Sequence, residues 1–572
     1  MNHIPLGVTL LVSLALPAFA TIQDSITKFP KTDYDFIVVG GGQAGCVVAN
    51  RLTENPRFNV LVIEAGPSHE GVLDAQVPGF VFNLSNTTYE YNYTSVATPH
   101  LNNRVFPVPR ARVLGGCSMH NGMFYTRGSS SDYDRWATVT GDSNWSWKKL
   151  FPYILKHERW VEPNRDVDTA GMYNPKVHNT KGMTFVSLTN FPDDSDAKVR
   201  QAADEIGGDF RWNLDYNSGD PLGVGWGQYT IGNGERSSAA TAYLAPRYLK
   251  RKNLHVLINH RVTKLLQTGH GGGHVPTFRT VAFQEEMNPS APIQKITARK
   301  EVILSAGIQP KVDLPSVGKN LTEHPAIAVS WKLGINGTFN SSADPTLPEK
   351  WFQEWQNSRT GPLTHIRTHS AAFIRLPDDS PIYNQHPDPS SGRSTPQFEI
   401  PITGLGYYPI PGPSMFAGAV VVQPSLESRG WVKLASTNVY DQPLIDVGML
   451  KSEFDWYGLR ETIRASKRFF SAPAWESYQL TLEPPFNTDV DEELNEAIKA
   501  AVSSGAHPVG TASMSPKNAQ WGVVDPDLRV KKVKGLRIVD ASIMPFIVSA
   551  HTQAAVYAIA ERGSDLIKHV WK

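Results

Sequence analysis

Two histidines near the C-terminal end of the chain have the side-chain type and the setting to move a proton. His507 lies in the stretch GAHPVGTASM, and His551 lies in VSAHTQAA. Histidine is the side chain most easily poised to accept a proton near neutral pH. The chain holds 17 histidines, so by its spacing alone His507 is more typical of a structural or exposed residue. The chemistry in question is general-base catalysis, and the elements around the pair must decide whether it occurs.

Glycines near the N-terminal end predict a nucleotide site. Gly40, Gly42 and Gly45 match the G-x-G-x-x-G spacing between an apolar run, which ends at Val39, and an amphipathic segment. The first allows a tight turn, the second lets the backbone approach a pyrophosphate, and the third lets helix and strand pack closely. A diphosphate would meet free N–H groups at the helix N-terminus. The alternative is an ordinary glycine-rich turn between a strand and a helix.

An acidic residue strengthens the nucleotide interpretation. A second apolar run, Val60 to Ile63, stops at Glu64, which lies about 20 residues beyond the glycines, where a carboxylate that binds an adenosine ribose is expected. Strand, turn, helix and strand in this order predict a Rossmann-type unit.

Composition and charge exclude several classes of protein. A length of 572 residues predicts two domains. Because 55 basic side chains balance 54 acidic ones and no basic arm occurs, we expect no nucleic-acid partner. No close set of His, Asp and Glu residues predicts a metal site, and no G-x-S-x-G motif predicts a serine hydrolase.

The N-terminal segment predicts secretion. Leu6 to Leu16 is an apolar run, and Ala18-Phe19-Ala20 resembles a signal-peptidase site, so we expect a signal peptide over residues 1–20. The run is too short to span a membrane comfortably, and no membrane association is expected. Cys46 and Cys117 are expected to be free thiols rather than a disulfide. Seven glycosylation sequons suit a secreted protein; they lie at Asn83, Asn86, Asn92, Asn144, Asn320, Asn336 and Asn340.

As a set, four stretches resemble the glucose–methanol–choline (GMC) oxidoreductases. They are GGGQAG, VLGGCSMHNGM, HPVGTASM and SAHTQAAVYAIAERGSDLI, and the resemblance runs from about Asp33 to the C-terminus. These proteins are flavoenzymes, and within the family the chain is most similar to fungal pyranose dehydrogenases and aryl-alcohol oxidases. The resemblance implies an α/β fold with a Rossmann-type FAD-binding domain and a second, α+β substrate domain built on an antiparallel sheet.

The resemblance also implies domain boundaries and cofactor contacts. The FAD-binding domain would comprise residues 33–85, 223–324 and 505–572, with a flavin-contact segment at 106–127, and the substrate-binding domain residues 86–222 and 325–504. His120 matches a histidine that bonds covalently to FAD in several members; a buried structural histidine is the alternative. Further FAD contacts, beyond Gly40, Gly42, Gly45 and Glu64, would come from Arg112, Gly115, Gly116, Asn121, Gly122, Met123, Val262, Asp540, Ala541, Thr552 and Gln553.

By the same resemblance, His507 is the base that removes the hydroxyl proton of an alcohol, and His551 hydrogen-bonds the substrate oxygen. A hydride would pass from the carbinol carbon to the flavin N5. We expect a monomer that oxidises a sugar or alcohol and passes electrons to a quinone or phenoxy radical. The alternative is an oxidase that acts on aryl or other alcohols and reduces oxygen to hydrogen peroxide.

One family feature is missing. After Gly307 the family continues with a helix that carries its second signature, whereas this chain passes almost directly into DLPSVG at Asp313. Loss of buried contacts beside FAD would leave the cofactor site open. A further alternative is therefore an inactive homologue that binds no FAD.

Overall fold

The computed structural model describes residues 22–164, 168–191, 195–270, 275–306, 315–334, 346–366, 368–403 and 416–572. The predicted signal peptide, the shortened segment after Gly307 and the sequons at Asn336 and Asn340 lie outside these ranges. Four other sequons expose their asparagine: Asn83, Asn86, Asn92 and Asn144.

A parallel six-stranded sheet forms the cofactor half of the molecule. Its order is β1 (Ile22–Gln23), β12 (Leu254–Leu257), β3 (Val60–Ile63), β2 (Phe36–Val39), β16 (Glu301–Leu304) and β26 (Leu536–Ile538). The strands β2, β3 and β12 are buried along their whole length, as expected for parallel strands covered on both faces. The chain leaves β2 toward β3 on one side and reaches β16 on the other, so the strand order reverses at β2.

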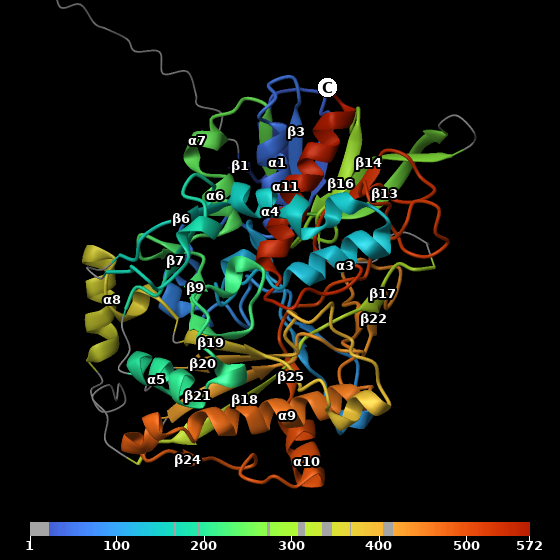
Figure 1. Ribbon diagram of the computed structural model, residues 1–572. Coiled ribbons are helices and arrows are strands. Elements are labelled where there is room, and N and C mark those ends of the chain that lie inside the picture. Colours follow the sequence, from blue (N-terminus) through green and yellow to red (C-terminus); the bar gives the residue numbers. More distant parts are fainter. Residues whose placement is uncertain are drawn as a thin grey trace, which may run out of the picture.

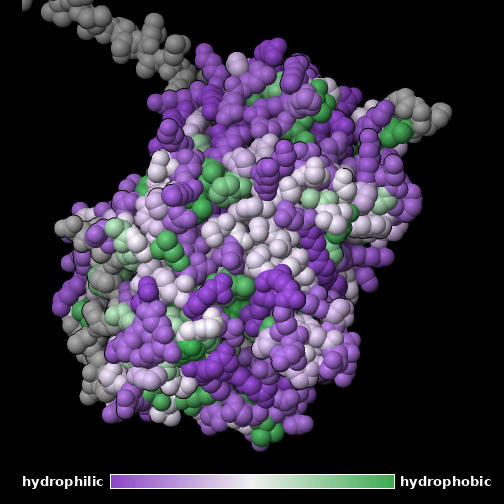
Figure 2. Space-filling model, viewed as in Figure 1, coloured by the Kyte–Doolittle hydropathy of each residue, from purple (hydrophilic) through white to green (hydrophobic). Residues whose placement is uncertain are grey.

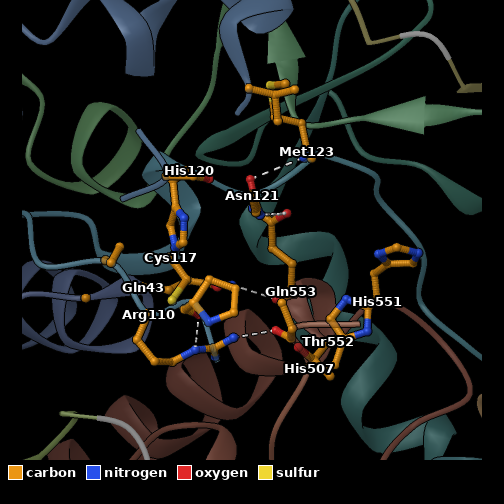
Figure 3. A pocket seen from close by; sticks show the side chains of 18 of the residues that line it. Gln43, Arg110, Cys117, His120, Asn121, Met123, His507, His551, Thr552 and Gln553 are labelled. Atoms are coloured by element: carbon orange, nitrogen blue, oxygen red, sulfur yellow. Dashed lines mark hydrogen bonds between the residues drawn. The ribbon is translucent and has the colours of Figure 1, made fainter. Parts of the chain in front are cut away.

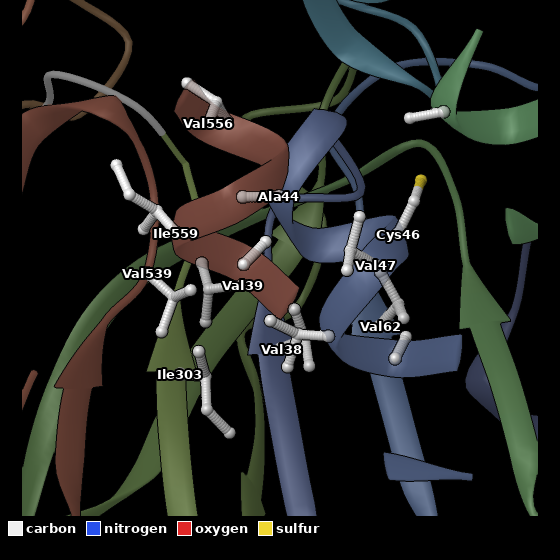
Figure 4. Packing of buried hydrophobic residues seen from close by; sticks show 14 of the residues in the cluster. Val38, Val39, Ala44, Cys46, Val47, Val62, Ile303, Val539, Val556 and Ile559 are labelled. Carbon is white, nitrogen blue, oxygen red and sulfur yellow. The ribbon is translucent and has the colours of Figure 1, made fainter. Parts of the chain in front are cut away.

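Two helices from opposite ends of the chain cover this sheet. Helix α1 (Gln43–Leu52) packs against α11 (Gln553–Val570). Val47, Val556 and Ile559 of these helices belong to one apolar cluster with Val38 of β2 and Val539, the residue after β26 (Figure 4).

A buried ion pair also joins these two helices. Arg51 on α1 donates from Nε and Nη2 to the fully buried carboxylate of Glu561 on α11, with Nη2 2.8 Å from Oε1. The first and last helices of the cofactor half are therefore one packing unit.

An antiparallel sheet forms the second half, which lies below the parallel sheet in Figure 1. Its order is β24 (Thr481–Leu482), β18 (Pro325–Lys332), β21 (Phe416–Val422), β20 (Phe398–Thr403), β19 (Thr368–Ile374) and β8 (Gly223–Trp226), and β25 (Ser503–Ser504) also pairs with β18. Helix α9 (Glu453–Phe470) packs on β20 and β21 and is flanked by α5 (Asp196–Ile206) and α10 (Asp491–Ala501). The predicted fold class, a Rossmann-type domain beside an antiparallel substrate domain, is confirmed.

One boundary differs from the expected one. Strand β8 falls in the range 223–324 that was assigned to the FAD-binding domain, but it pairs with β19 at the edge of the antiparallel sheet. The sheet that a short strand joins depends on the strand with which it pairs, and a short strand without a local motif does not reveal that partner in its sequence.

The remaining elements connect and flank the two sheets. Three-stranded sheets are β13 (His260–His270), β14 (Pro276–Glu285) and β15 (Gln294–Thr297); β17 (Lys319–Leu321), β22 (Gly430–Lys433) and β23 (Leu444–Asp446); and β6 (Glu158–Trp160), β7 (Thr184–Leu188) and β9 (Gln228–Tyr229). Pairs are β4 (Tyr93–Thr94) with β5 (Pro107–Val108), and β10 (Ile231–Gly232) with β11 (Glu235–Arg236). The other helices are α2 (Leu73–Gln76), α3 (Ser130–Thr140), α4 (Trp147–His157), α6 (Ala239–Tyr243), α7 (Pro246–Leu249) and α8 (Leu347–Ser358).

The face of the molecule shown in Figure 2 is largely hydrophilic, and its hydrophobic groups are small and separated. Among the described residues, no helix combines the length and the apolar character needed to cross a bilayer.

Candidate active site

A cavity of about 900 Å³ opens at the carboxyl ends of the parallel strands. The residues that follow β2, β3, β16 and β26 all line it or border it, and they include Gly40, Glu64, Ser305 and Asp540. Ligands of open α/β sheets bind at these strand ends, beside the point where the strand order reverses. The topology therefore places the cavity where a nucleotide site is expected.

Two glycine turns from separate parts of the chain meet at this cavity. Gly42 precedes α1, and Gly116, with φ +57°, opens the short 3-10 helix Gly116–Met119. A Cβ added to Gly116 would lie 2.7 Å from the Cα of Gly42. Gly45 is needed for packing instead, since its Cβ would lie 2.0 Å from the carbonyl oxygen of Gly40. Glycine at these positions lets two backbone segments approach each other and a ligand.

Glu64 is buried at the end of β3. Its carboxylate accepts backbone hydrogen bonds from Gly41 and Gly66, both at 2.7 Å. Burial raises the pKa of Glu64 to about 7, although these two N–H groups act in the opposite direction. The carboxyl group is thus held in place beside the first glycine turn.

Most of the residues predicted to form the site line this one cavity. They are Gly40, Gly42, Glu64, Gly116, His120, Asn121, Gly122, Met123, Val262, His507, Asp540, Ala541, His551, Thr552 and Gln553. Several are connected to one another: the Asn121 side chain donates to Oε1 of Gln553 at 3.0 Å, and Asp540 caps the turn at Ser542.

Three predicted residues, Gly45, Gly115 and Arg112, do not line the cavity. Gly115 packs beside Met119, and Arg112 points away, where its guanidinium donates to the carbonyl of Thr88 at 2.6 Å. Arg110, two residues earlier, lines the cavity instead and donates from Nη2 to the carbonyl of Ala506 at 2.5 Å.

The rings of His507 and His551 lie next to each other on one wall of the cavity (Figure 3). The ring centroids of His507 and His551 are 4.6 Å apart, with the ring planes at 76°. Nδ1 of His507 lies 3.1 Å from Nδ1 of the buried His324, and Nε2 of His551 lies 2.8 Å from Oε1 of the fully buried Glu399. Each ring thus has one nitrogen engaged by a residue of the antiparallel half, which leaves the other nitrogen for a ligand.

The surroundings keep His507 uncharged. Burial lowers the pKa of His507 well below its usual value, and His551, His324 and Arg110 lower it further. The neighbouring carboxyl of Glu323 accepts from the backbone N–H of His507 at 2.9 Å, and burial raises the pKa of Glu323 to about 7. A neutral imidazole that lines a cavity can accept a proton.

The cysteines are free thiols among the described residues. Cys117 lines the cavity next to His120 (Figure 3). Burial raises the pKa of Cys117, but Arg110 and His120 outweigh it and bring the pKa to about 6. In the described part of the chain, no group of three or more His, Cys, Asp or Glu side chains is arranged to hold a metal ion.

Comparison with known proteins decides the family. Residues 34–326 match the N-terminal family model of the GMC oxidoreductases, and residues 427–560 match the C-terminal one.

The chain belongs to the GMC oxidoreductases.

Relatives match it over nearly its whole length. A pyranose dehydrogenase of Agaricus campestris is 38% identical over 608 residues, which cover 97% of this chain and 98% of that protein. This aligned length exceeds the 572 residues of the chain, so the alignment holds positions that the chain lacks.

Solved structures agree. An FAD-dependent oxidoreductase from Chaetomium thermophilum has a TM-score of 0.84 at 27% identity and covers 94% of this chain and 100% of its own. A fungal aryl-alcohol oxidase has a TM-score of 0.81 at 25% identity, with coverage of 95% and 100%. The chain is therefore an FAD-dependent oxidoreductase that acts on CH–OH groups.

The residues of this GMC oxidoreductase fit FAD. The cavity volume of about 900 Å³ is at the upper end of the 300–1,000 Å³ typical of ligand pockets. Nε2 of Gln553 is buried and has no hydrogen-bond partner among the described residues, and a flavin ring edge offers acceptors for such a donor. The glycine turns would hold the diphosphate, Glu64 the ribose, and the segment from His120 to Met123 the flavin.

Sequence reasoning missed the residues that support the histidines. His324 and Glu399 lie in or beside strands of the antiparallel sheet and have no recognisable glycine or histidine motif of their own. The prediction places Arg112 at the cofactor, whereas Arg110, two residues earlier, takes that place on the cavity wall. The only available signal was the run of two ionisable residues, Glu323 and His324.

Proposed function

We propose that this enzyme oxidises a ring hydroxyl of a sugar and passes the electrons to a quinone-type acceptor. The observation that carries the proposal is the pair of imidazoles, 4.6 Å apart, on the wall of a cavity that two glycine turns also line. His507 and His551 can bind one hydroxyl group between them. The similarity to a pyranose dehydrogenase over nearly the whole chain supports a sugar as the substrate.

The histidines divide the work on the hydroxyl group. His507, which is held neutral, accepts the hydroxyl proton, and His551, held through Nε2 by Glu399, orients the oxygen through its other ring nitrogen. FAD, when bound, supplies the two-electron oxidant. Phe124 packs edge-on against His551, with ring centroids 5.0 Å apart, and restricts the movement of that ring.

Replacement of His507 tests this assignment. The His507→Ala variant should bind flavin with an unchanged absorbance spectrum, but sugar should bleach that spectrum much more slowly. Because a general base contributes about 10²–10⁴-fold to a rate, the loss should fall in this range. Unchanged bleaching would remove His507 from the role of base.

We also propose that His120 bonds covalently to FAD. His120 lines the cavity, its ring lies beside the Cys117 thiol, and the segment that carries it is fixed by the hydrogen bond between Asn121 and Gln553. Acid precipitation should leave the yellow colour on the protein, and His120→Ala should release it into the supernatant. Free flavin from the unaltered protein would contradict the bond.

An oxidase that acts on aryl alcohols is the second candidate. It is favoured by the TM-score of 0.81 to a fungal aryl-alcohol oxidase and by Phe124 and Trp351, which line the cavity with aromatic surface. Oxygen consumption measured against reduction of a quinone dye, with glucose and with veratryl alcohol, separates the two candidates. Purified protein without flavin absorbance would contradict both and favour the FAD-free homologue.

Secretion remains part of the proposal. The exposed sequons at Asn83, Asn86, Asn92 and Asn144 support it. Detection of N-linked glycans on protein from culture medium, with an N-terminus near residue 21, is the test; protein confined to cells would contradict it.

A further inference from the structure

The ring of His324 contacts the ring of His507. Their Nδ1 atoms are 3.1 Å apart, the ring centroids are 5.2 Å apart and the planes are at 82°. His324 is fully buried. A neutral imidazole has one N–H and one bare nitrogen, so at this distance one Nδ1 must donate and the other must accept.

The proposed role of His507 as the base decides the direction of this bond. Burial lowers the pKa of His324 to about 3, although the backbone of Pro424 acts in the opposite direction, so the ring is neutral and has a single proton. Nε2 of His324 is buried and has no hydrogen-bond partner among the described residues, so contacts on that side of the ring do not fix the place of the proton. Because Nδ1 of His507 faces His324, only Nε2 of His507 can take the hydroxyl proton, and it must be bare to do so; His507 then donates from Nδ1, and Nδ1 of His324 accepts.

We propose that His324 is a positioning residue that selects the tautomer of His507. His507 donates from Nδ1 to His324, and its Nε2 keeps the lone pair that takes the hydroxyl proton. The inference rests on the proposed role of His507 as the base and adds the residue that prepares it. In the opposite tautomer, Nε2 of His507 would carry a proton and could not act as a base.

Backbone hydrogen bonds fix the two segments that carry the rings of His324 and His507. Thr322 and Val509 exchange hydrogen bonds of 3.1 and 3.0 Å, and the N–H of Gly505 donates to the carbonyl of His324 at 2.8 Å. Glu323 accepts from the backbone N–H of His507 at 2.9 Å and from the hydroxyl of Ser504 at 3.0 Å. The segments that carry the two histidines are thus paired like strands, and the ring contact does not depend on a flexible loop.

Other ionisable groups around His507 act on its charge but do not select its tautomer. They are Arg110, His551 and Glu323, of which Arg110 and His551 disfavour the imidazolium form. Glu323 contacts the backbone N–H and not the ring. His324 is the group that binds a ring nitrogen of His507 directly.

Two substitutions of His324, by side chains that have nearly the same shape as each other, test the proposal in the flavin-loaded enzyme. His324→Asn places a side-chain oxygen near the position of Nδ1 and can still accept from His507, whereas His324→Leu cannot. In His324→Leu, the rate of flavin reduction by sugar should fall at least about tenfold. The fall should be the same at every pH at which the rate of the unaltered enzyme does not depend on pH. It should not exceed the general-base contribution of about 10²–10⁴-fold. His324→Asn should recover most of this loss. Equal rates in His324→Leu and the unaltered enzyme, or equal losses in both variants, would overturn the proposal.

A spectroscopic measurement tests the tautomer without catalysis. In protein labelled with ¹⁵N-histidine, magic-angle-spinning NMR at neutral pH distinguishes a bare ring nitrogen from an N–H, and His507→Gln identifies the signals of His507. The expected result is N–H at Nδ1 and a bare Nε2; N–H at Nε2 would overturn the proposal even if His324→Leu fails to fold.

These outcomes separate the inference from the proposed function. If His507→Ala still reduces flavin with sugar, the role of base fails, whatever tautomer the NMR spectra show. If His507→Ala is inactive but His324→Leu reduces flavin as fast as the unaltered enzyme, the role of base stands and the selection by His324 fails.

Discussion

Gly116 lies directly against Gly42, so that a single added methyl group would come within 2.7 Å of the Cα of Gly42. The two residues belong to different turns, and both line the cavity. Their contact joins the flavin-contact segment to the turn before α1. The first prediction concerns this contact.

Gly116→Ala should cost the enzyme its flavin. Its φ of +57° already penalises alanine by about 1–2 kcal/mol, and the clash with Gly42 forces the turns apart. Gly141→Ala is the matched control, since Gly141 has φ +69° but nothing within 4 Å of an added Cβ. Flavin absorbance per protein should fall in Gly116→Ala and stay unchanged in Gly141→Ala; equal retention in both would refute the role of the contact.

The pH dependence of sugar oxidation should reflect the lowered pKa of His507. A base whose pKa is depressed stays neutral further into the acid range, so its activity is present above that pKa and is lost as pH falls through it. The rate of flavin reduction should therefore remain level from mildly alkaline pH to well below 6.5, the ordinary pKa of histidine. Stopped-flow absorbance measures this rate. An acid limb centred at or above pH 6.5 would contradict the assigned environment.

Glu399→Gln should impair the orientation of substrate without unfolding the protein. The carboxylate of Glu399 engages Nε2 of His551 at 2.8 Å and is fully buried. An amide keeps the shape but removes the charge that favours an N–H at Nε2. We expect kcat to fall by about 10²-fold, within the range of acid–base contributions, while flavin content and Tm change little. A normal kcat would show that His551 needs no charged partner.

Cys117 should be alkylated at unusually low pH. Despite burial, Arg110 and His120 bring its pKa to about 6, whereas an ordinary thiol has a pKa of about 8.5. Iodoacetamide should react with Cys117 with a midpoint near pH 6, and bound flavin should slow the reaction. Cys46 is the internal control, because burial raises its pKa and keeps it unreactive. Peptide mapping by mass spectrometry distinguishes the two sites; a midpoint near pH 8.5 at Cys117 would count against the effect of Arg110 and His120 on the thiol.

Removal of one partner of the ion pair between α1 and α11 should lower the free energy of unfolding more than replacement of both partners by apolar residues. Glu561→Ala leaves the buried guanidinium of Arg51 uncompensated except for Glu54, and loss of one partner of a buried pair costs about 3–5 kcal/mol. The double variant Arg51→Met, Glu561→Leu should recover most of this free energy of unfolding. Chemical denaturation measures both. A double variant as unstable as Glu561→Ala would show that the charges themselves are required.

Local sequence patterns predict the elements around the nucleotide site well. The apolar runs at residues 36–39 and 60–63 coincide with β2 and β3, because strands buried on both faces need an uninterrupted apolar run. These elements obey local rules, so the chain before folding already specifies them.

The support of the active-site histidines could not be predicted in this way. His324 and Glu399 reach the site only because β17, β18 and β20 come to lie beside the C-terminal segments, and such long-range pairing leaves no local signal. The choice between Arg110 and Arg112 failed for a related reason. Side chains two residues apart point to the same side of a regular strand, so the different directions of Arg110 and Arg112 show an irregular backbone here, which the sequence does not reveal.

The C-terminal residues complete a site that the first strands begin. Strand β26, His507, His551 and α11 all come from the last part of the chain, and the indole of Trp571, the penultimate residue, donates to Glu301 on β16 at 2.8 Å. Chains emerge from the ribosome N-terminal end first, so the nascent glycine turn has no opposite wall while translation continues. Flavin capture must therefore wait until β26, His551 and α11 have left the ribosome, and a nonsense codon before α11 would yield a colourless protein.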